Sequence, residues 1–195
     1  MSEFQLYFVL GKDHILDYVN GYDHILFVLA LCAVYVISDW KKILILVTAF
    51  TVGHSITLAL ATLNLISIDS DWIEFLIPMT IFITALGNLF RKEQPFQLAR
   101  IQVNYVFALF FGLIHGMGFS NYLRALLGKD ESLAMQLFAF NVGLEAGQII
   151  IVGIFLAVSF IVVNLASVNR RDWKIIISSA VAGIALMLLK DRIPD

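Results

Sequence analysis

Long apolar stretches separated by short polar breaks dominate this 195-residue chain. A bilayer has roughly 30 Å of hydrocarbon, which takes about 20 mostly apolar residues to cross. Only helices and closed barrels satisfy the backbone inside a membrane, and the stretches lack the period-two alternation of barrel strands. The pattern therefore predicts an all-α, polytopic membrane helix bundle with about six transmembrane helices, forming a single transmembrane domain over residues 1–195. The six segments cover residues 22–37, 43–66, 72–90, 101–119, 133–164 and 173–189.

Two weaker patterns extend this prediction. In the first 20 residues, aromatic and aliphatic side chains precede the charged positions, which favours an N-terminal half-helix. Between the fourth and fifth segments, apolar residues recur at helical spacing beside basic ones, which is typical of either a short interfacial helix or an ordinary loop. The residues that form this second pattern are Phe119, Tyr122, Leu123, Leu126 and Leu127.

Composition agrees with a membrane protein. Hydrophobic residues make up 60% of the chain and charged residues 14%, whereas about a quarter of a soluble domain is charged. The net charge of −2 offers no basic surface for a nucleic acid. The lone Cys32 excludes a disulfide framework and a Cys-pair metal site. The first ten residues carry Glu3 and no cationic stretch, so no cleavable signal peptide is expected.

Basic residues give an expected orientation. If six helices alternate in direction, eight Lys and Arg residues fall on one side and five on the other. Because cytoplasmic loops are enriched in basic residues, the first side is predicted to be cytoplasmic. We therefore expect a multi-pass protein of the inner (plasma) membrane with both termini outside the cytoplasm. The first side holds Lys41, Lys42, Arg91, Lys92, Arg100, Arg170, Arg171 and Lys174.

The polar residues within the apolar segments are the functional candidates. An ionisable side chain at the centre of a membrane helix costs about 2.5–3.5 kcal/mol on insertion scales. All four histidines of the chain, His14, His24, His54 and His115, lie in or beside these segments. Helix caps, helix packing or buried hydrogen bonds are the structural alternatives for each of them.

Acidic residues accompany the histidines. Asp23 precedes His24, and Asp17 shares a helical face with His14 and His24. Glu145 lies mid-segment on one helical face with Asn141 and Gln148.

Imidazole and carboxylate groups without thiolate suit nickel, cobalt, zinc, iron or manganese. The segment centres contain no Lys or Arg to pair with the carboxylates. The sequence therefore predicts a site for a divalent transition metal ion, with nickel, cobalt or zinc as the leading choices. Polar residues that we expect to orient its ligands are Thr51, Ser55, Asn88, Asn104, Asn141 and Gln148.

Four short sequence motifs around the histidines and Glu145 together resemble the HupE/UreJ family. These membrane proteins are found with hydrogenase and urease systems and are regarded as nickel or cobalt permeases. The matching stretches are residues 21–27, 50–58, 112–119 and 140–148, in the same order. The resemblance implies that the metal-handling residues are Asp23, His24, His54, His115 and Glu145. His14 and Asp17 resemble the upstream His-containing part of the family signature, with a different spacing and with Asp17-Tyr18 in place of its His-Pro form.

We carry three hypotheses of function from the sequence. The leading one is a permease for a divalent transition metal, with Ni²⁺ or Co²⁺ as the leading choice, in which His24 and His115 receive the ion and pass it to His54 and Glu145. The second is an intramembrane zinc-dependent hydrolase that uses Ser55 or Glu145 to activate water. The third is a membrane protein that binds the metal without transport. The expected partners are the lipid bilayer and the metal ion; whether the chain forms a homo-oligomer stays open.

Overall fold

The computed structural model describes residues 2–19, 21–91, 98–119 and 133–194, with side chains from residue 104 onward in the third range. Within these ranges every regular element is a helix, which confirms the predicted helical membrane bundle. The α-helices are α1 (Glu3–Leu16), α2 (Tyr22–Cys32), α3 (Trp40–Thr62), α4 (Ser70–Phe90), α5 (Leu98–Gly118), α7 (Leu133–Phe160) and α8 (Arg170–Asp191). A 3-10 turn, η1 (Ile37–Asp39), precedes α3, and a π-helix, η2 (Ile161–Leu165), extends α7.

The six predicted apolar segments correspond to α2, α3, α4, α5, α7 and α8. Four stretches are long and apolar enough to cross a membrane: Ile37–Thr62, Ser70–Phe90, Leu133–Leu165 and Arg170–Asp191. Two shorter apolar stretches, Tyr22–Cys32 and Asn104–Gly118, complete the set. Helix α2 ends at Cys32, five residues before the predicted end of the first segment at residue 37. The predicted interfacial helix lies outside the described residues.

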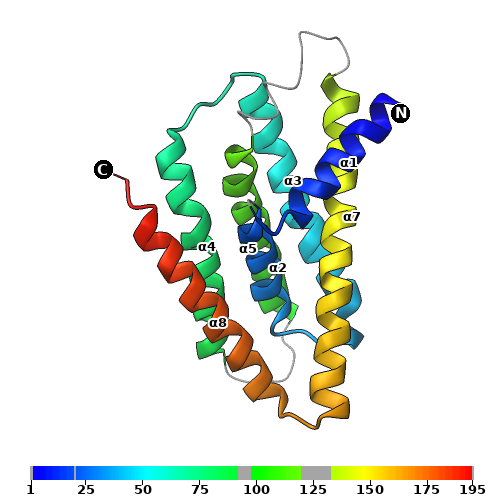
Figure 1. The fold of residues 1–195 in the computed structure, drawn as a ribbon, viewed down its shortest axis with the longest axis vertical. Coiled ribbons are helices and arrows are strands. Elements are labelled where there is room, and N and C mark those ends of the chain that lie inside the picture. Colours follow the sequence, from blue (N-terminus) through cyan, green and yellow to red (C-terminus); the bar gives the residue numbers. More distant parts are fainter. Residues whose placement is uncertain (1, 20, 92–97, 120–132, 195) are drawn as a thin grey trace.

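The first pass through the bundle consists of two half-helices. Helix α1 starts with a capping box, in which Ser2 Oγ accepts from the Gln5 amide and Gln5 Oε1 accepts from the Ser2 amide. It ends at Leu16, and the chain turns before α2 continues toward the opposite end of the bundle (Figure 1). The two helices have 14 and 11 residues, so together they measure about 37 Å at 1.5 Å per residue. A break in a membrane helix is tolerated where it lines a cavity.

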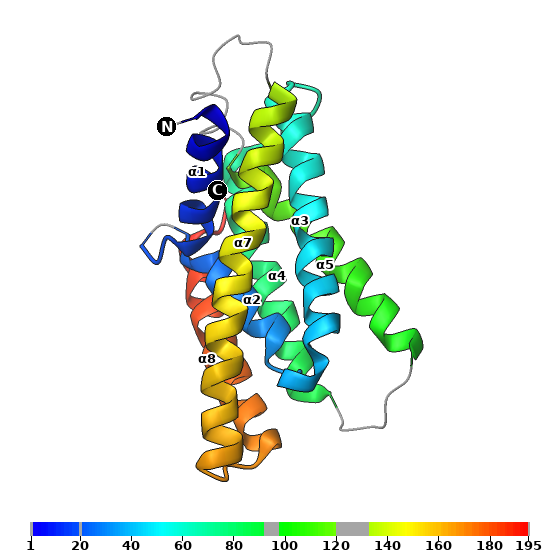
Figure 2. The same cartoon turned by 90° about the vertical axis from the view of Figure 1, so that its right-hand side faces the viewer.

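Glycines hold the helices in two close pairs. Helix α1 lies along α7, and α3 lies along α5, as Figure 2 shows. A Cβ on Gly11 would clash with the carbonyl oxygen of Phe140, and one on Gly112 would clash with that of Phe50. Backbones at this distance require small residues at the contact. The first pair contains His14, and the second contains His54 and His115.

The start of α1 and the end of α8 lie toward the same end of the bundle, here called the upper end (Figure 1). This end also contains the start of α4 and the end of α5, while the start of α3 and the end of α4 lie at the lower end. Seven of the eight basic residues of the expected cytoplasmic side belong to helix ends at the lower end, and Lys92 lies outside the described residues. The side of the membrane that each end faces stays a prediction.

Candidate metal centre

Three histidines from three different helices meet at the break in the first pass. His14 lies in the last turn of α1, His24 in the first turn of α2 and His54 in the middle of α3. One ring nitrogen of each lies within 4.8 Å of the others. The His14 and His24 rings have centroids 4.7 Å apart, and each is 6.2 Å from that of His54. We call these three residues the histidine cluster.

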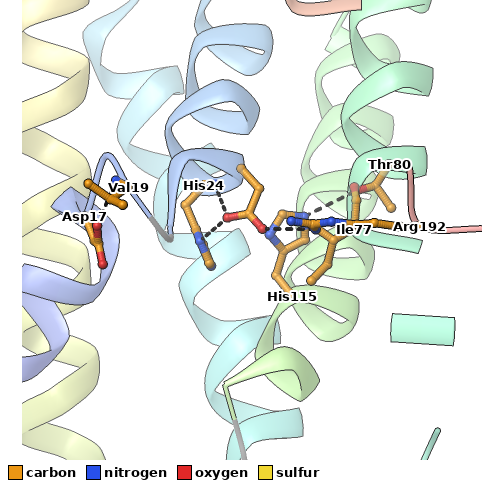
Figure 3. Close-up of polar contacts among 8 residues, drawn as sticks. Asp17, Val19, His24, Ile77, Thr80, His115 and Arg192 are labelled. Carbon is orange, nitrogen blue, oxygen red and sulfur yellow. Dashed lines mark hydrogen bonds and ion pairs between the residues drawn. The ribbon is translucent and has the colours of Figure 1, made fainter. Parts of the chain in front are cut away.

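His115 on α5 lies beside the cluster, with its ring centroid 5.2 Å from that of His24. Its Nε2 is 3.2 Å from Thr80 Oγ1, whose hydroxyl donates to the carbonyl oxygen of Ile77 at 2.7 Å (Figure 3). A hydroxyl has one proton to donate, so toward His115 it accepts. The ring proton of His115 is therefore on Nε2, which leaves the lone pair of Nδ1 available to a metal.

Asp23 holds a negative charge against the cluster. Its Oδ1 accepts a 2.8 Å hydrogen bond from the His24 amide and lies 2.9 Å from His24 Nδ1. This carboxylate also lies in the first turn of α2, where the helix dipole stabilises a negative charge. An imidazole that keeps its proton on the nitrogen facing a carboxylate offers the other nitrogen to a metal. For His24, whose Nδ1 lies close to Asp23 Oδ1 but does not meet the angular requirement of a hydrogen bond, that nitrogen is Nε2.

Several ring nitrogens at this site are buried and make no hydrogen bond within the described part of the chain. His54 is 0% exposed and His115 is 1% exposed. A buried polar atom without a partner costs about 1–3 kcal/mol, so the unbound cluster is costly, and a metal ion would satisfy several nitrogens at once. These nitrogens include His14 Nε2, His24 Nε2, both nitrogens of His54, and His115 Nδ1.

The dimensions of the cluster fit a metal after a small contraction. A zinc ion lies about 2.0–2.1 Å from each imidazole nitrogen, which allows at most about 4.2 Å between two ligand atoms. The 4.8 Å limit among the cluster nitrogens exceeds this by a few tenths of an ångström, which rotation of side chains supplies. Imidazole suits nickel, zinc, copper and iron, and the absence of thiolate at the site disfavours soft ions such as Cu(I).

His14 and His24 of the cluster, together with His115, line a cavity of about 630 Å³, which we call the upper cavity. Four acidic residues and three histidines line it, and Arg192 at the end of α8 is the one Lys or Arg among the described residues that line it. Arg192 Nη1 lies 3.9 Å from Asp23 Oδ2 (Figure 3). A cavity with carboxylates on its walls concentrates cations. The acidic lining residues are Asp13, Asp17, Asp23 and Glu74.

Glu145 on α7 makes a hydrogen bond with α3. Its Oε1 accepts a 2.6 Å hydrogen bond from Thr48 on α3. It belongs neither to the group of ligand atoms nor to the described lining of the upper cavity. Asp17, by contrast, lines this cavity with His14, and its Oδ1 accepts from the Val19 amide in the turn between the half-helices.

The polar residues expected to orient the ligands bond elsewhere. Ser55 donates to the Thr51 carbonyl and Asn141 donates to the Leu137 carbonyl, each on its own helix. Gln148 accepts from the Thr51 hydroxyl. Asn104 donates to the Tyr35 hydroxyl, and it lies 11 residues before His115, which is about 16 Å along α5.

Sequence reasoning missed three residues at the site. Thr80 contacts His115, Arg192 faces Asp23, and the Phe119 ring lies against His14 with centroids 3.9 Å apart. Two signals were available: the spacing of Thr80 and Thr84 on one face of α4, and the only basic residues after the last segment, Lys190 and Arg192. Neither signal indicates contact with a histidine.

A comparison with family models agrees with the four motifs. The family described as "HupE / UreJ protein" matches residues 1–192, nearly the whole chain. The resemblance in the sequence is thereby confirmed. Neither a curated protein nor a solved structure matches the chain.

Proposed function

Because the chain belongs to the HupE/UreJ family, whose members are linked to nickel and cobalt, we propose that it carries a divalent transition metal ion, Ni²⁺ or Co²⁺, across the membrane through the histidine cluster. The observation that carries this proposal is the meeting of three histidines at the break between α1 and α2, next to a cavity lined by four carboxylates. Broken membrane helices hold the ion sites of many transporters, because their ends supply partial charges and free backbone groups.

In the proposed route, the metal enters from the upper cavity. The carboxylates of Asp17 and Asp23 attract it, and the imidazoles of His14, His24 and His54 replace part of its hydration shell. The end of α1 adds the negative end of a helix dipole, which favours a cation. His115, with Nδ1 available, is the next ligand toward the interior.

The membrane potential contributes energy to transport in this direction. One elementary charge gains about 2.3 kcal/mol per 100 mV, so a divalent ion gains about 4.6 kcal/mol. With the upper end outside the cytoplasm, as the basic residues predict, a negative interior draws the ion inward. An ATP-binding motif is also absent from the sequence, which fits transport driven by the potential, by coupled protons or by a partner.

The hydrolase alternative loses support at the residues it requires. A metal-dependent hydrolase needs a group beside the ion that polarises water or shuttles a proton. Ser55 donates to a carbonyl of its own helix, and Glu145 accepts from Thr48, so each expected group already has another hydrogen-bond partner.

Uptake into proteoliposomes tests the proposal. Purified protein is reconstituted with a metal-sensitive dye inside the vesicles, and Ni²⁺ or Co²⁺ is added outside under an imposed negative-inside potential. We expect dye signal with the wild type, none in protein-free vesicles, and none with His24→Leu. Calorimetric binding of Ni²⁺ or Co²⁺ without any uptake would overturn transport and favour the binding-only hypothesis.

A further inference from the structure

A second cavity lies at the lower end of the bundle, beyond the histidine cluster. Its volume is about 490 Å³, and we call it the lower cavity. Helices α4 and α5 line both cavities: Ile77 and His115 line the upper one, and Ile83 and Phe111 line the lower one. The cavities are separated by about 6 Å along α5 and about 9 Å along α4 at 1.5 Å per residue.

Three phenylalanines fill this separation. Phe27, Phe50 and Phe111 come from α2, α3 and α5 and are 0%, 1% and 6% exposed. The Phe27 ring centroid lies 5.0 Å from that of Phe50 and 5.7 Å from that of Phe111. Phe27 and Phe50 each lie 5.2 Å from the His115 ring. An apolar constriction of this kind blocks a hydrated ion by excluding water.

One face of α4 carries polar side chains from above the three phenylalanines to below them. Thr80, Thr84 and Asn88 are spaced four residues apart and therefore share a helix face. Thr80 contacts His115 above the layer, while Thr84 and Asn88 line the lower cavity below it. Thr80 and Asn88 are 3% and 7% exposed, so this polar face is turned into the protein. The three side chains donate to backbone carbonyls, which leaves lone pairs on the side-chain oxygens of Thr84 and Asn88.

We propose that the ion leaves the histidine cluster along this face of α4, past the phenylalanines, and enters the lower cavity. The inference rests on the proposed function and specifies the second half of its route. Hydroxyl and amide oxygens of Thr80, Thr84 and Asn88 give the ion ligands at steps of about 6 Å. Movement of the Phe111 ring, which borders the lower cavity, opens the passage between Thr80 and Thr84. Oxygen ligands bind such an ion more weakly than imidazoles do, so the ion is released more easily from this face of α4 than from the histidine cluster. Conduction requires sites that the ion can leave.

A matched pair of threonine variants tests the route. Thr84→Val removes a hydroxyl that donates to the carbonyl four residues earlier at 2.8 Å. Thr57→Val removes a hydroxyl of the same kind, which donates to the Gly53 carbonyl at 3.2 Å and lines neither cavity in the described structure. We expect Thr84→Val to lower the initial Ni²⁺ uptake rate about fivefold or more, with calorimetric Ni²⁺ affinity within about twofold of wild type. Thr57→Val should match the wild type in both measurements.

Thiol labelling gives an independent measurement. In a Cys32→Ala background, Thr84→Cys should react with a small membrane-impermeant methanethiosulfonate from the same side as Ser38→Cys, an exposed position before α3. Thr57→Cys should stay unlabelled. Wild-type uptake with normal Thr84→Val uptake, or a Thr84→Cys that is unreactive or labelled from the opposite side, would overturn this route while leaving the proposed function intact. Absence of wild-type uptake would instead overturn the proposed function and the route with it.

Discussion

Arg192 places Nη1 3.9 Å from Asp23 Oδ2, so the last described basic residue of the chain faces the first acidic residue of α2. The guanidinium is a tethered cation at the mouth of a cavity that we assign to metal entry. It competes with the incoming ion for the same carboxylate. It also helps to balance the charge of a buried aspartate when no metal is bound.

Arg192→Gln is therefore expected to raise the affinity for Ni²⁺. The pair is partly exposed, so the gain is modest, about fivefold or about 1 kcal/mol, and it should shrink in high salt. Calorimetric titration at two ionic strengths measures both effects. Lys190→Gln is the matched control, because this exposed side chain is at the same end of α8 and does not line the upper cavity. Equal affinities in the two variants would contradict the competition.

His54→Leu is expected to remove metal binding without unfolding the protein. The leucine has a similar volume and is apolar, while both nitrogens of His54 are buried without hydrogen-bond partners within the described part of the chain. The metal-free melting temperature should therefore stay constant or rise, while Ni²⁺ affinity falls about 100-fold or more. Circular dichroism measures the metal-free melting temperature, and calorimetry measures the Ni²⁺ affinity. A lower metal-free melt with retained affinity would show that His54 supports packing only.

Thr80→Val is expected to weaken metal binding about 10- to 100-fold, the usual effect of removing a residue that orients a ligand. Thr80 fixes which nitrogen of His115 keeps its proton, since its hydroxyl already donates to Ile77. Thr57→Val serves as the control for loss of a buried hydroxyl. If affinity is unchanged, His115 is not a ligand or its tautomer is set by another group.

The sequence motif and the structure give different expectations for Glu145, and a double-mutant cycle separates them. If its main role is the hydrogen bond with Thr48, Glu145→Ala and Thr48→Val should each lower the metal-free free energy of unfolding, by about 1–3 kcal/mol for Glu145→Ala. The double variant should then cost less than the sum of the singles. Calorimetry on the same proteins should give near wild-type Ni²⁺ affinity. If Glu145→Ala loses Ni²⁺ affinity while Thr48→Val keeps it, Glu145 belongs to the metal site.

The expected orientation can be checked with C-terminal fusions. The eight-to-five distribution of basic residues predicts that a reporter after Asp195 lies outside the cytoplasm. A phosphatase reporter that is active only outside the cytoplasm should be active there, and a fluorescent reporter that folds only inside should be dark. The opposite result would reverse the direction of metal entry.

Hydrophobic patterning predicted the helices well, because long apolar segments must be helical in a membrane. The cost of burying an imidazole also directed attention to all four histidines. Patterning did not predict which residues would meet. His14 and His54 are 40 residues apart in sequence, and their proximity depends on how α1 and α3 each pack on α7. Glu145 lies in a family motif, yet its carboxylate reaches Thr48.

Hydroxyl groups were the least predictable part of the site. A threonine inside a helix usually bonds its own backbone, and Thr57 does so. Thr80 makes the same kind of bond and contacts His115 as well. The sequence of α4 holds no ionisable residue near Thr80 that would distinguish the two cases.

The half-helices at the start of the chain affect how the protein is made. A helix of 14 residues followed by one of 11 is a poor substrate for insertion during synthesis, because neither reaches the length of a membrane span alone. Helix α1 packs mainly on α7, which the ribosome completes more than 120 residues later. Helix α1 therefore reaches its packed position only after α7 is synthesised, and the histidine cluster, which includes His14, is completed only then.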